Sequence, residues 1–504
     1  MLLSTSSPMA DPVALAHAHN GALPRSIPVT RPVWPVAAPA HAFTLRGRLV
    51  DSLVRVVAAP GRGIIPGGSR NLWRKGFWGI ADQALISAAH FISTILVARV
   101  ISPREFGLYA LAYTGLVFLN TIQSALVTEP HTTLGAPLTG TRYVAYTTDT
   151  GWLQVLLCIA SALLVLAIAV PATIQGWWVA PVILALAPAT VAWQLQTYVR
   201  RAMYTRSRVS QAFINDLLSY GGHIIIVAGL WWKGNLTPVV ALLALAATSA
   251  LGSLLGLWQI RRQLDRTLSR DRIRPTARAN WGFGKWLLGE HIAYWTSGQI
   301  YPVLAAGFVS ITATGALRAI DTIMGPTNVL RIALDPLFAP RAARTFARGG
   351  KPALLQLIRR LQVLNVIAIG AYCITVMIFA GPILRLVYGD AYSPYSWVLV
   401  LVSMITLVNA LRSPIRIGLK TLGQTNAIFR TNLAASLADL TLGLALVYLI
   451  GFPGVAIGLV LNMLVFQGTT WYFWNKATTH EDPSDSRASR SVAPSVDMRE
   501  GWTV

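Results

Sequence analysis

Ionisable side chains lie inside long apolar stretches of this sequence, where charge is costly. In one such stretch Asp321, Asn328 and Asp335 are seven residues apart, which places them on one face of a helix. Arg318 and Arg331 lie three and four residues from the two acids. Each arginine can pair within its helix and fix packing, or it can present its guanidinium to a phosphate. The spacing alone leaves both interpretations open.

Other apolar stretches add polar groups at helical spacing. Glu290 and Tyr294 share a face in the seventh stretch, and Arg412 lies between Asn409 and Arg416 in the tenth. We predict that an anionic, hydroxyl-rich substrate is bound by five side chains: Arg318, Arg331, Arg412, Asn328 and Tyr294. We predict that a coupling proton or cation is taken up by three acids: Asp82, Glu290 and Asp321.

Seven of the 19 acidic residues fall in apolar stretches: Asp82, Asp149, Asp216, Glu290, Asp321, Asp335 and Asp439. At about 2.5 to 3.5 kcal/mol each, facing them all to lipid would cost roughly 20 kcal/mol. Most must therefore face protein, a water-filled cavity or a membrane boundary. For Asp149 and Asp439 we expect a boundary position, where the side chain reaches water.

The composition predicts that these stretches cross a membrane. Hydrophobic residues make up 54% of the 504 residues and charged residues 12%, about half the charged fraction of soluble proteins. Each stretch is apolar throughout, which favours helices over barrel strands. We predict twelve transmembrane helices: 76–101, 106–128, 143–170, 177–198, 209–231, 236–260, 283–308, 313–338, 362–384, 394–418, 427–450 and 453–474.

The distribution of charge predicts the orientation. The formal net charge is +23, but the basic residues lie between apolar stretches, which argues against a nucleic-acid partner. Arginine-rich connections follow the fourth, sixth and eighth stretches, so these loops and both termini are predicted to be cytoplasmic. Cys158 and Cys373 lie in apolar stretches, and no catalytic, metal-ligand or cofactor motif is present. We therefore expect no catalytic residue, metal or cofactor.

Two registers of self-similarity divide the chain into halves. A shift of 208 residues places Asp82 on Glu290, and a shift of 217 places Asn215 on Asn432. Both shifts pair stretches six apart, which predicts two parallel six-helix lobes. The expected domains are a disordered basic tail 1–72, an N-lobe 73–260, a basic linker 261–281, a C-lobe 282–475 and a disordered tail 476–504. An amphipathic helix at 43–58 and a flexible arm with chance periodicity are equally good interpretations of that part of the tail.

Two segments resemble a known family. They are "ALISAAHFISTILVARVISPREFGLYALA" at 84–112 and "GQTNAIFRTNLAASLADLTLGLALVYLIGFPGVAIG" at 423–458. Both resemble polysaccharide exporters of the multidrug/oligosaccharidyl-lipid/polysaccharide (MOP) flippase superfamily, and the likeness covers about residues 70–475. The resemblance implies a V-shaped pair of six-helix lobes around a central cavity. It also implies alternating access, often driven by an ion gradient.

The resemblance and the charged stripes together predict a transporter and not an enzyme. The expected substrate is an undecaprenyl-pyrophosphate-linked oligosaccharide, flipped across the bacterial inner membrane for exopolysaccharide or O-antigen synthesis. Expected partners are this lipid-linked substrate, membrane lipids, and a polymerase with its export machinery. Two alternatives are a multidrug or lipid II exporter of the same superfamily and a membrane-embedded polysaccharide polymerase or acyltransferase. The short predicted outer loops and the lack of a catalytic motif disfavour the enzyme.

Overall fold

The computed structural model describes residues 69–265 and 270–479, and every regular element in these residues is helical. The first half forms α2 (Ser69–Val100), α3 (Pro103–Gln123), α4 (Glu129–Gly135), α5 (Gly140–Ile174), α6 (Ala180–Thr205), α7 (Val209–Asp216), α8 (Gly222–Trp232) and α9 (Pro238–Ile260). The second half forms α10 (Arg270–Gln299), α11 (Tyr301–Phe308), α12 (Ile311–Ile378), α13 (Ala380–Tyr388), α14 (Ser396–Thr421), α15 (Thr425–Ala438), α16 (Leu444–Ile450) and α17 (Phe452–Thr479).

All twelve predicted stretches fall on helices. Among the described residues, ten helices are long and apolar enough to cross a membrane. The predicted stretches 283–308 and 313–338 are helical as well, in α10, α11 and the first part of α12, but they are not among those ten. The chain is therefore an all-helical, multi-pass membrane protein.

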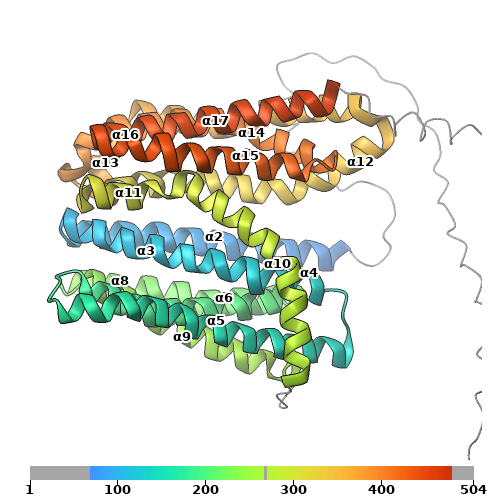
Figure 1. The fold of residues 1–504 in the computed structure, drawn as a ribbon, viewed down its shortest axis with the longest axis horizontal. Helices are drawn as coiled ribbons and strands as arrows, with labels where there is room; N and C mark the ends of the chain where they lie inside the picture. Colours follow the sequence, from blue (N-terminus) through green and yellow to red (C-terminus); the bar gives the residue numbers. More distant parts are fainter. Residues whose placement is uncertain (1–68, 266–269, 480–504) are drawn as a thin grey trace, which may run out of the picture. The chain divides into compact units, whose positions relative to one another are not determined.

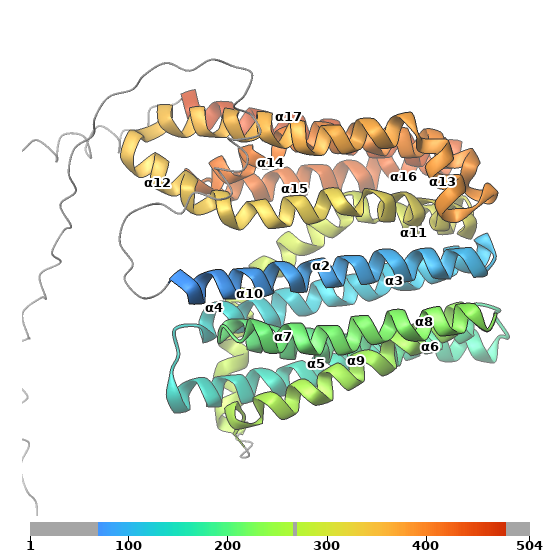
Figure 2. The same ribbon diagram turned by 180° about the vertical axis from the view of Figure 1, so that it is seen from behind.

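Within Gly67–Val504 the helices sort by their half of the chain. Figures 1 and 2 show α5 to α9 gathered on one side of α2 and α3, and α12 and α14 to α17 gathered on the other. The long helix α12 turns back on itself at Gly349 and Gly350, where Gly350 has a φ of 61°. Because a positive φ favours glycine, this pair breaks α12 into two helical segments that run in opposite directions.

Helix α10 crosses between the two groups of helices (Figure 1). Near its start, Arg272 forms ion pairs with Asp149 of α5 at 2.9 Å and with Asp265 at 3.0 Å. Asp149 is almost fully buried and paired, so its side chain does not reach water as expected. Farther along, Ser297 and Gly298 leave helical geometry, with a φ of 91° at Gly298, and the chain bends toward α11.

The turn between α2 and α3 is held by a reciprocal cap. The Ser102 hydroxyl accepts from the Glu105 backbone N–H at 3.3 Å, and the Ser102 N–H donates to Glu105 Oε2 at 2.9 Å. Pro103 occupies the first position of α3, where its missing N–H costs nothing. This cap fixes the direction in which α3 leaves the turn.

A π-helical turn occurs in one pair of corresponding stretches of the two halves. Leu217–Gly221 (η2) joins α7 to α8, and Asp439–Gly443 (η5) joins α15 to α16. These are the fifth and eleventh predicted stretches, which the 217-residue register pairs. Such turns widen a helix locally and often occur at functional sites. In the 217-residue register the first turn falls on residues 434–438, directly before the second, so the two turns are offset by five residues.

The predicted tails mostly lie outside the described residues. This holds for the tail 1–72 up to Ser69, for its segment 43–58, and for 476–504 beyond Thr479. Helix α2 begins at Ser69 and α17 ends at Thr479, so both helices extend into segments predicted as tails. The other predicted domain boundaries stay predictions.

Candidate substrate cavity between the two groups of helices

A polar cavity of about 790 Å³ lies between the two halves. Its walls come from α3 of the first half and from α10, α12 and α14 of the second. Five of the eight predicted site residues line it: Tyr294, Arg318, Asp321, Asn328 and Arg331. The structure thus brings together the part of the predicted site that lies on α10 and α12.

The polar stripe of α12 runs along the cavity. Arg318 and Arg331 both line it, although they are 13 residues apart. At 1.5 Å per residue their Cα atoms are separated by about 20 Å along the helix. A single diphosphate is far shorter than that. The two guanidinium groups therefore mark successive positions along the cavity and do not form one clamp.

Arg318 stacks on an aromatic ring instead of pairing within its helix. Its Cζ lies 4.1 Å from the centroid of the Tyr113 ring on α3. Its Nε has no hydrogen-bond partner, and no ion pair to Asp321 occurs among the described residues. Asp321 is exposed to the cavity. Both ions thus remain available to a ligand or to water.

Among the described side chains, Arg331 is held by an amide. Its Nη2 donates to Asn328 Oδ1 at 3.2 Å, so these two predicted residues act as one polar unit. Tyr294 lines the same cavity from α10, and its side chain is exposed there. The side chain of Asp335, the other predicted partner of Arg331, lies outside the described residues.

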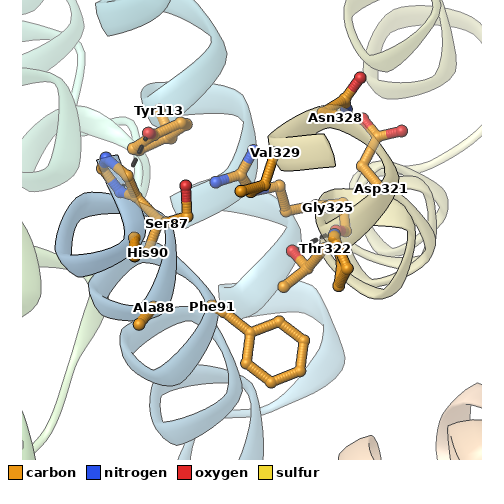
Figure 3. Close-up of a pocket in the computed structure, with 13 residues that line it drawn as sticks. Ser87, Ala88, His90, Phe91, Tyr113, Asp321, Thr322, Gly325, Asn328 and Val329 are labelled. Atoms are coloured by element: carbon orange, nitrogen blue, oxygen red, sulfur yellow. Dashed lines mark hydrogen bonds between the residues drawn. The ribbon is translucent and has the colours of Figure 1, made fainter. Parts of the chain in front are cut away.

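An apolar cavity of about 560 Å³ adjoins the polar one. Figure 3 shows Ala88 and Phe91 on α2 at one wall and Gly325 and Val329 on α12 at the other. Four residues line both cavities: Tyr113, Arg318, Asp321 and Asn328. The polar and apolar cavities thus lie next to each other, with these four side chains of α3 and the first part of α12 between them.

Arg412 does not line the polar cavity. It is 8% exposed, its Cζ lies 4.2 Å from the centroid of the Phe466 ring, and its Nε has no hydrogen-bond partner. A buried guanidinium with an open donor is a costly arrangement. Its predicted contact with phosphate stays a prediction.

Asp82 is sealed inside the first half. It is 0% exposed, and its Oδ2 lies 2.7 Å from Nη2 of Arg200 and 2.5 Å from the Tyr204 hydroxyl on α6. Arg200 Nε also lies 2.7 Å from Asp216 of α7. Two buried carboxylates thus share one guanidinium. Asp82 has no basic neighbour within its own helix, but its partner lies 118 residues away.

Glu290, the repeat counterpart of Asp82, has different partners. Asn432 Nδ2 donates to its Oε1 at 3.0 Å, and His291 Nε2 lies 3.7 Å from its Oε2. His291 lines the polar cavity and also lies 3.4 Å from Glu129. Glu290 therefore contacts His291 of the cavity wall but does not itself line the cavity. The two acids that the repeat pairs, Asp82 and Glu290, thus have different surroundings.

A buried carboxylate in the second half was not predicted as part of a site. Asp439 is 0% exposed, so its side chain does not reach water as expected. It accepts from the Gly298 N–H at 2.9 Å, the Tyr301 hydroxyl at 2.8 Å and Asn462 Nδ2 at 2.6 Å. One signal in the sequence was Asn462, an amide side chain in a neighbouring apolar stretch. Residue spacing could not reveal that α10 bends toward Asp439 and Asn462.

The two halves touch directly at one end of the cavity. A Cβ added to Gly107 of α3 would overlap the backbone carbonyl of Ile311 at the start of α12. Arg99 Nε donates to the Val387 carbonyl of α13 at 2.8 Å. The Phe106 ring packs 6.0 Å from the Tyr392 ring, centroid to centroid. This end is predicted to be the outer one, and these contacts close it.

Comparison with known families agrees with this architecture. A family model described as "Polysaccharide biosynthesis protein" matches residues 95–397, which is more than half of the chain. The chain belongs to this family. The matched region of this polysaccharide biosynthesis protein contains the closing contacts and all the cavity residues of α3, α10 and the first part of α12. No curated protein matches the sequence.

Solved structures of membrane transporters have a similar fold. The eukaryotic MATE transporter AtDTX14 matches with a TM-score of 0.57 and 16% identity, over 81% of this chain and 97% of that one. The lipid II flippase MurJ in its inward closed conformation matches with a TM-score of 0.57 and 12% identity, over 80% and 89%. A MOP superfamily transporter from Pyrococcus furiosus matches with a TM-score of 0.56 and 13% identity, over 84% and 98%. The predicted family and all-helical fold are confirmed.

Proposed function

We propose that this protein flips an undecaprenyl-pyrophosphate-linked oligosaccharide across the bacterial inner membrane, for exopolysaccharide or O-antigen synthesis. The observation that carries the proposal is that the 790 Å³ polar cavity lies directly beside the 560 Å³ apolar one, with four lining residues in common. A substrate with an anionic, sugar-bearing head and a hydrocarbon tail places one part in each. Arg318 and Arg331 have no carboxylate partner among the described side chains, and such guanidinium groups suit a diphosphate head.

The two arginines of α12 suggest a path for the head group. Arg331 lies nearer the end that is predicted to be cytoplasmic, and Arg318 lies about 20 Å farther along the helix. The diphosphate meets Arg331 and Asn328 first and Arg318 afterwards. Tyr113 and Trp295 line the cavity near Arg318 and offer ring faces on which a sugar can pack. A polymerase and export machinery would then use the flipped repeat unit.

Coupling to an ion gradient is proposed at the buried and cavity-facing acids. Asp82 and Asp216 share Arg200, so the cluster carries one excess negative charge that a proton would neutralise. Asp321 faces the cavity and Glu290 lies just behind it. An ion drives transport only if it binds the inward and outward states with different affinity.

The test uses the full-length protein in proteoliposomes that contain a lipid-linked oligosaccharide. The fraction of sugar that becomes accessible to a membrane-impermeant lectin is followed over time. Arg318→Gln removes the charge at the junction, and we expect at least about a tenfold slower rate because a charge-assisted hydrogen bond is lost. The matched control is Arg385→Gln, since Arg385 is an exposed arginine whose only described ion pair, with Asp390, lies at the surface.

A second pair of variants tests the apolar cavity. Ala88→Trp fills part of it, and we expect transport to fall below about a tenth while the protein still purifies as a folded species. Ile80→Trp is the control, because Ile80 is exposed on the same helix but does not line the cavity. Normal flipping by both Arg318→Gln and Ala88→Trp would overturn the proposal. Flipping of lipid II alone would favour the lipid II exporter, and a change in saccharide chain length would favour a polymerase.

A further inference from the structure

A second apolar groove lies on the surface of the second half, on faces of α12 and α14 that do not line the central cavity. Its volume is about 390 Å³, and its walls are Arg359, Gln362, Val363, Val366 and Ile367 of α12 with Leu411 of α14. The central cavity is lined by other faces of the same helices, through Ile369, Asn409 and Ser413. Residues two apart on a helix point in nearly opposite directions. The groove and the cavity therefore do not communicate through these side chains.

The groove is exposed, and its walls are apolar apart from Arg359 and Gln362. Val363 is 60% exposed, Ile367 is 50% exposed and Leu411 is 38% exposed. The Gln362 amide donates to the Leu411 carbonyl at 3.0 Å, which ties α12 to α14 and satisfies the polar group on the floor. From Arg359 to Ile367 the groove follows the helix for about 12 Å. It thus has one charged end and one hydrocarbon-like end.

The charged end has no counter-ion in the part of the chain that the structure describes. Arg359 forms no ion pair within the described residues, and the sequence contains no Asp or Glu between residues 338 and 389. The same segment carries seven basic residues: Arg341, Arg344, Arg348, Lys351, Arg359, Arg360 and Arg385. All but Arg385 lie in or beside the connection predicted to be cytoplasmic. The surface around Arg359 is therefore complementary to an anionic membrane leaflet.

We propose that this groove binds an anionic glycerophospholipid of the cytoplasmic leaflet. The lipid phosphate contacts the Arg359 guanidinium, and one acyl chain lies along Val363, Val366 and Ile367 against Leu411. The charge selects an anionic head group, and the shape of the groove selects a hydrocarbon chain. The site is separate from the proposed substrate cavity and does not depend on the substrate.

The test measures the lipid that stays bound to the full-length protein. The protein is purified in detergent with equal amounts of phosphatidylglycerol and phosphatidylcholine, and bound lipids are counted by native mass spectrometry. We expect wild-type protein to retain phosphatidylglycerol preferentially. Arg359→Gln should reduce that preference about fivefold, the effect of one basic residue at an anionic surface. Arg360→Gln removes the same charge from an adjacent exposed position outside the groove and should leave the preference unchanged.

A third variant separates the groove from its charge. Val363→Trp fills the groove and keeps Arg359, so bound phosphatidylglycerol should fall, and Ile367→Trp replaces it if the first variant does not fold. Equal losses in Arg359→Gln and Arg360→Gln would overturn the proposal, because they would indicate diffuse attraction. Unchanged retention in the filled groove would overturn it as well. Displacement of the lipid by inorganic phosphate alone, or by a polyprenyl phosphate at equal concentration, would overturn the assignment to a glycerophospholipid.

Discussion

Replacing Gly107 with alanine should open the closed end of the cavity. The added methyl group would overlap the Ile311 backbone carbonyl of α12, and the Ile311 side chain lies behind it. Backbone atoms cannot rotate away as the tip of a side chain can. Relief therefore requires α3 and α12 to separate at this point, which the closed state does not permit.

The size of the effect follows from the contact. Overpacking by one methyl group in a tight interface typically costs 1 to 3 kcal/mol, and a clash with backbone lies at the upper end, about 3 kcal/mol. Because 1.36 kcal/mol is a factor of ten, the population of the closed state relative to an open one falls about 150-fold. Gly115→Ala is the matched control. It lies on the same helix, and its added Cβ would meet only the Leu186 side chain at 3.8 Å, an ordinary contact.

The separation can be measured as a distance between labels at that end. Gln175 follows α5 in the first half and Leu386 lies on α13 in the second, and both are exposed. Spin labels on cysteines placed there should give the same distance in wild type and in Gly115→Ala, and a longer one in Gly107→Ala. Identical distance distributions in the two glycine variants, with both proteins folded, would refute the view that this contact holds the end closed.

Two further substitutions test the buried polar clusters through the thermal stability of the purified protein. Arg200→Leu leaves two buried carboxylates without their shared cation and should lower the free energy of unfolding by about 3 to 5 kcal/mol. Adding Asp82→Asn to Arg200→Leu should restore part of that loss. Equal melting temperatures of the wild type, the single variant and the double variant would contradict the shared ion pair. Asp439→Asn turns an amide N–H toward donors and should cost about 1 to 3 kcal/mol, whereas Asp390→Asn, at an exposed ion pair, should cost less than about 1 kcal/mol. If the two Asn variants melt together, the Asp439 hydrogen bonds contribute nothing.

The positions of the helices could be predicted because the bilayer fixes their length. An apolar stretch of about 20 residues has few alternatives in hydrocarbon, so each predicted stretch coincides with a helix. The stripe of Arg318, Asp321, Asn328 and Arg331 could be predicted from the sequence for a similar reason. All four lie on one helix, and helical spacing alone determines that they share a face.

The rest of the site depends on contacts between helices, which spacing does not encode. Asp82 has no basic residue three or four positions away on α2. It forms an ion pair with Arg200 of α6, which is 118 residues away in the sequence. Asp439 likewise owes its burial to a bend in α10 at Gly298. The sequence also contains a local signal for the turn before α3, because Ser102 and Glu105 have the spacing of a capping box. This role explains why Glu105 follows Ser102 and Pro103.

The closed end and the cavity are built on the same two helices, which bears on how a ligand could move them. Gly107 and Tyr113 lie about 9 Å apart along α3, and Gly315 and Arg318 lie about 4.5 Å apart along α12. The glycine contact and the Tyr113–Arg318 stack therefore hold adjoining levels of one helix pair. A phosphate that draws Arg318 away from Tyr113 weakens that pairing, so it binds the parted state better than the closed one. A neutral ligand leaves the stack intact and supplies no such difference, which is the condition for driving a conformational change.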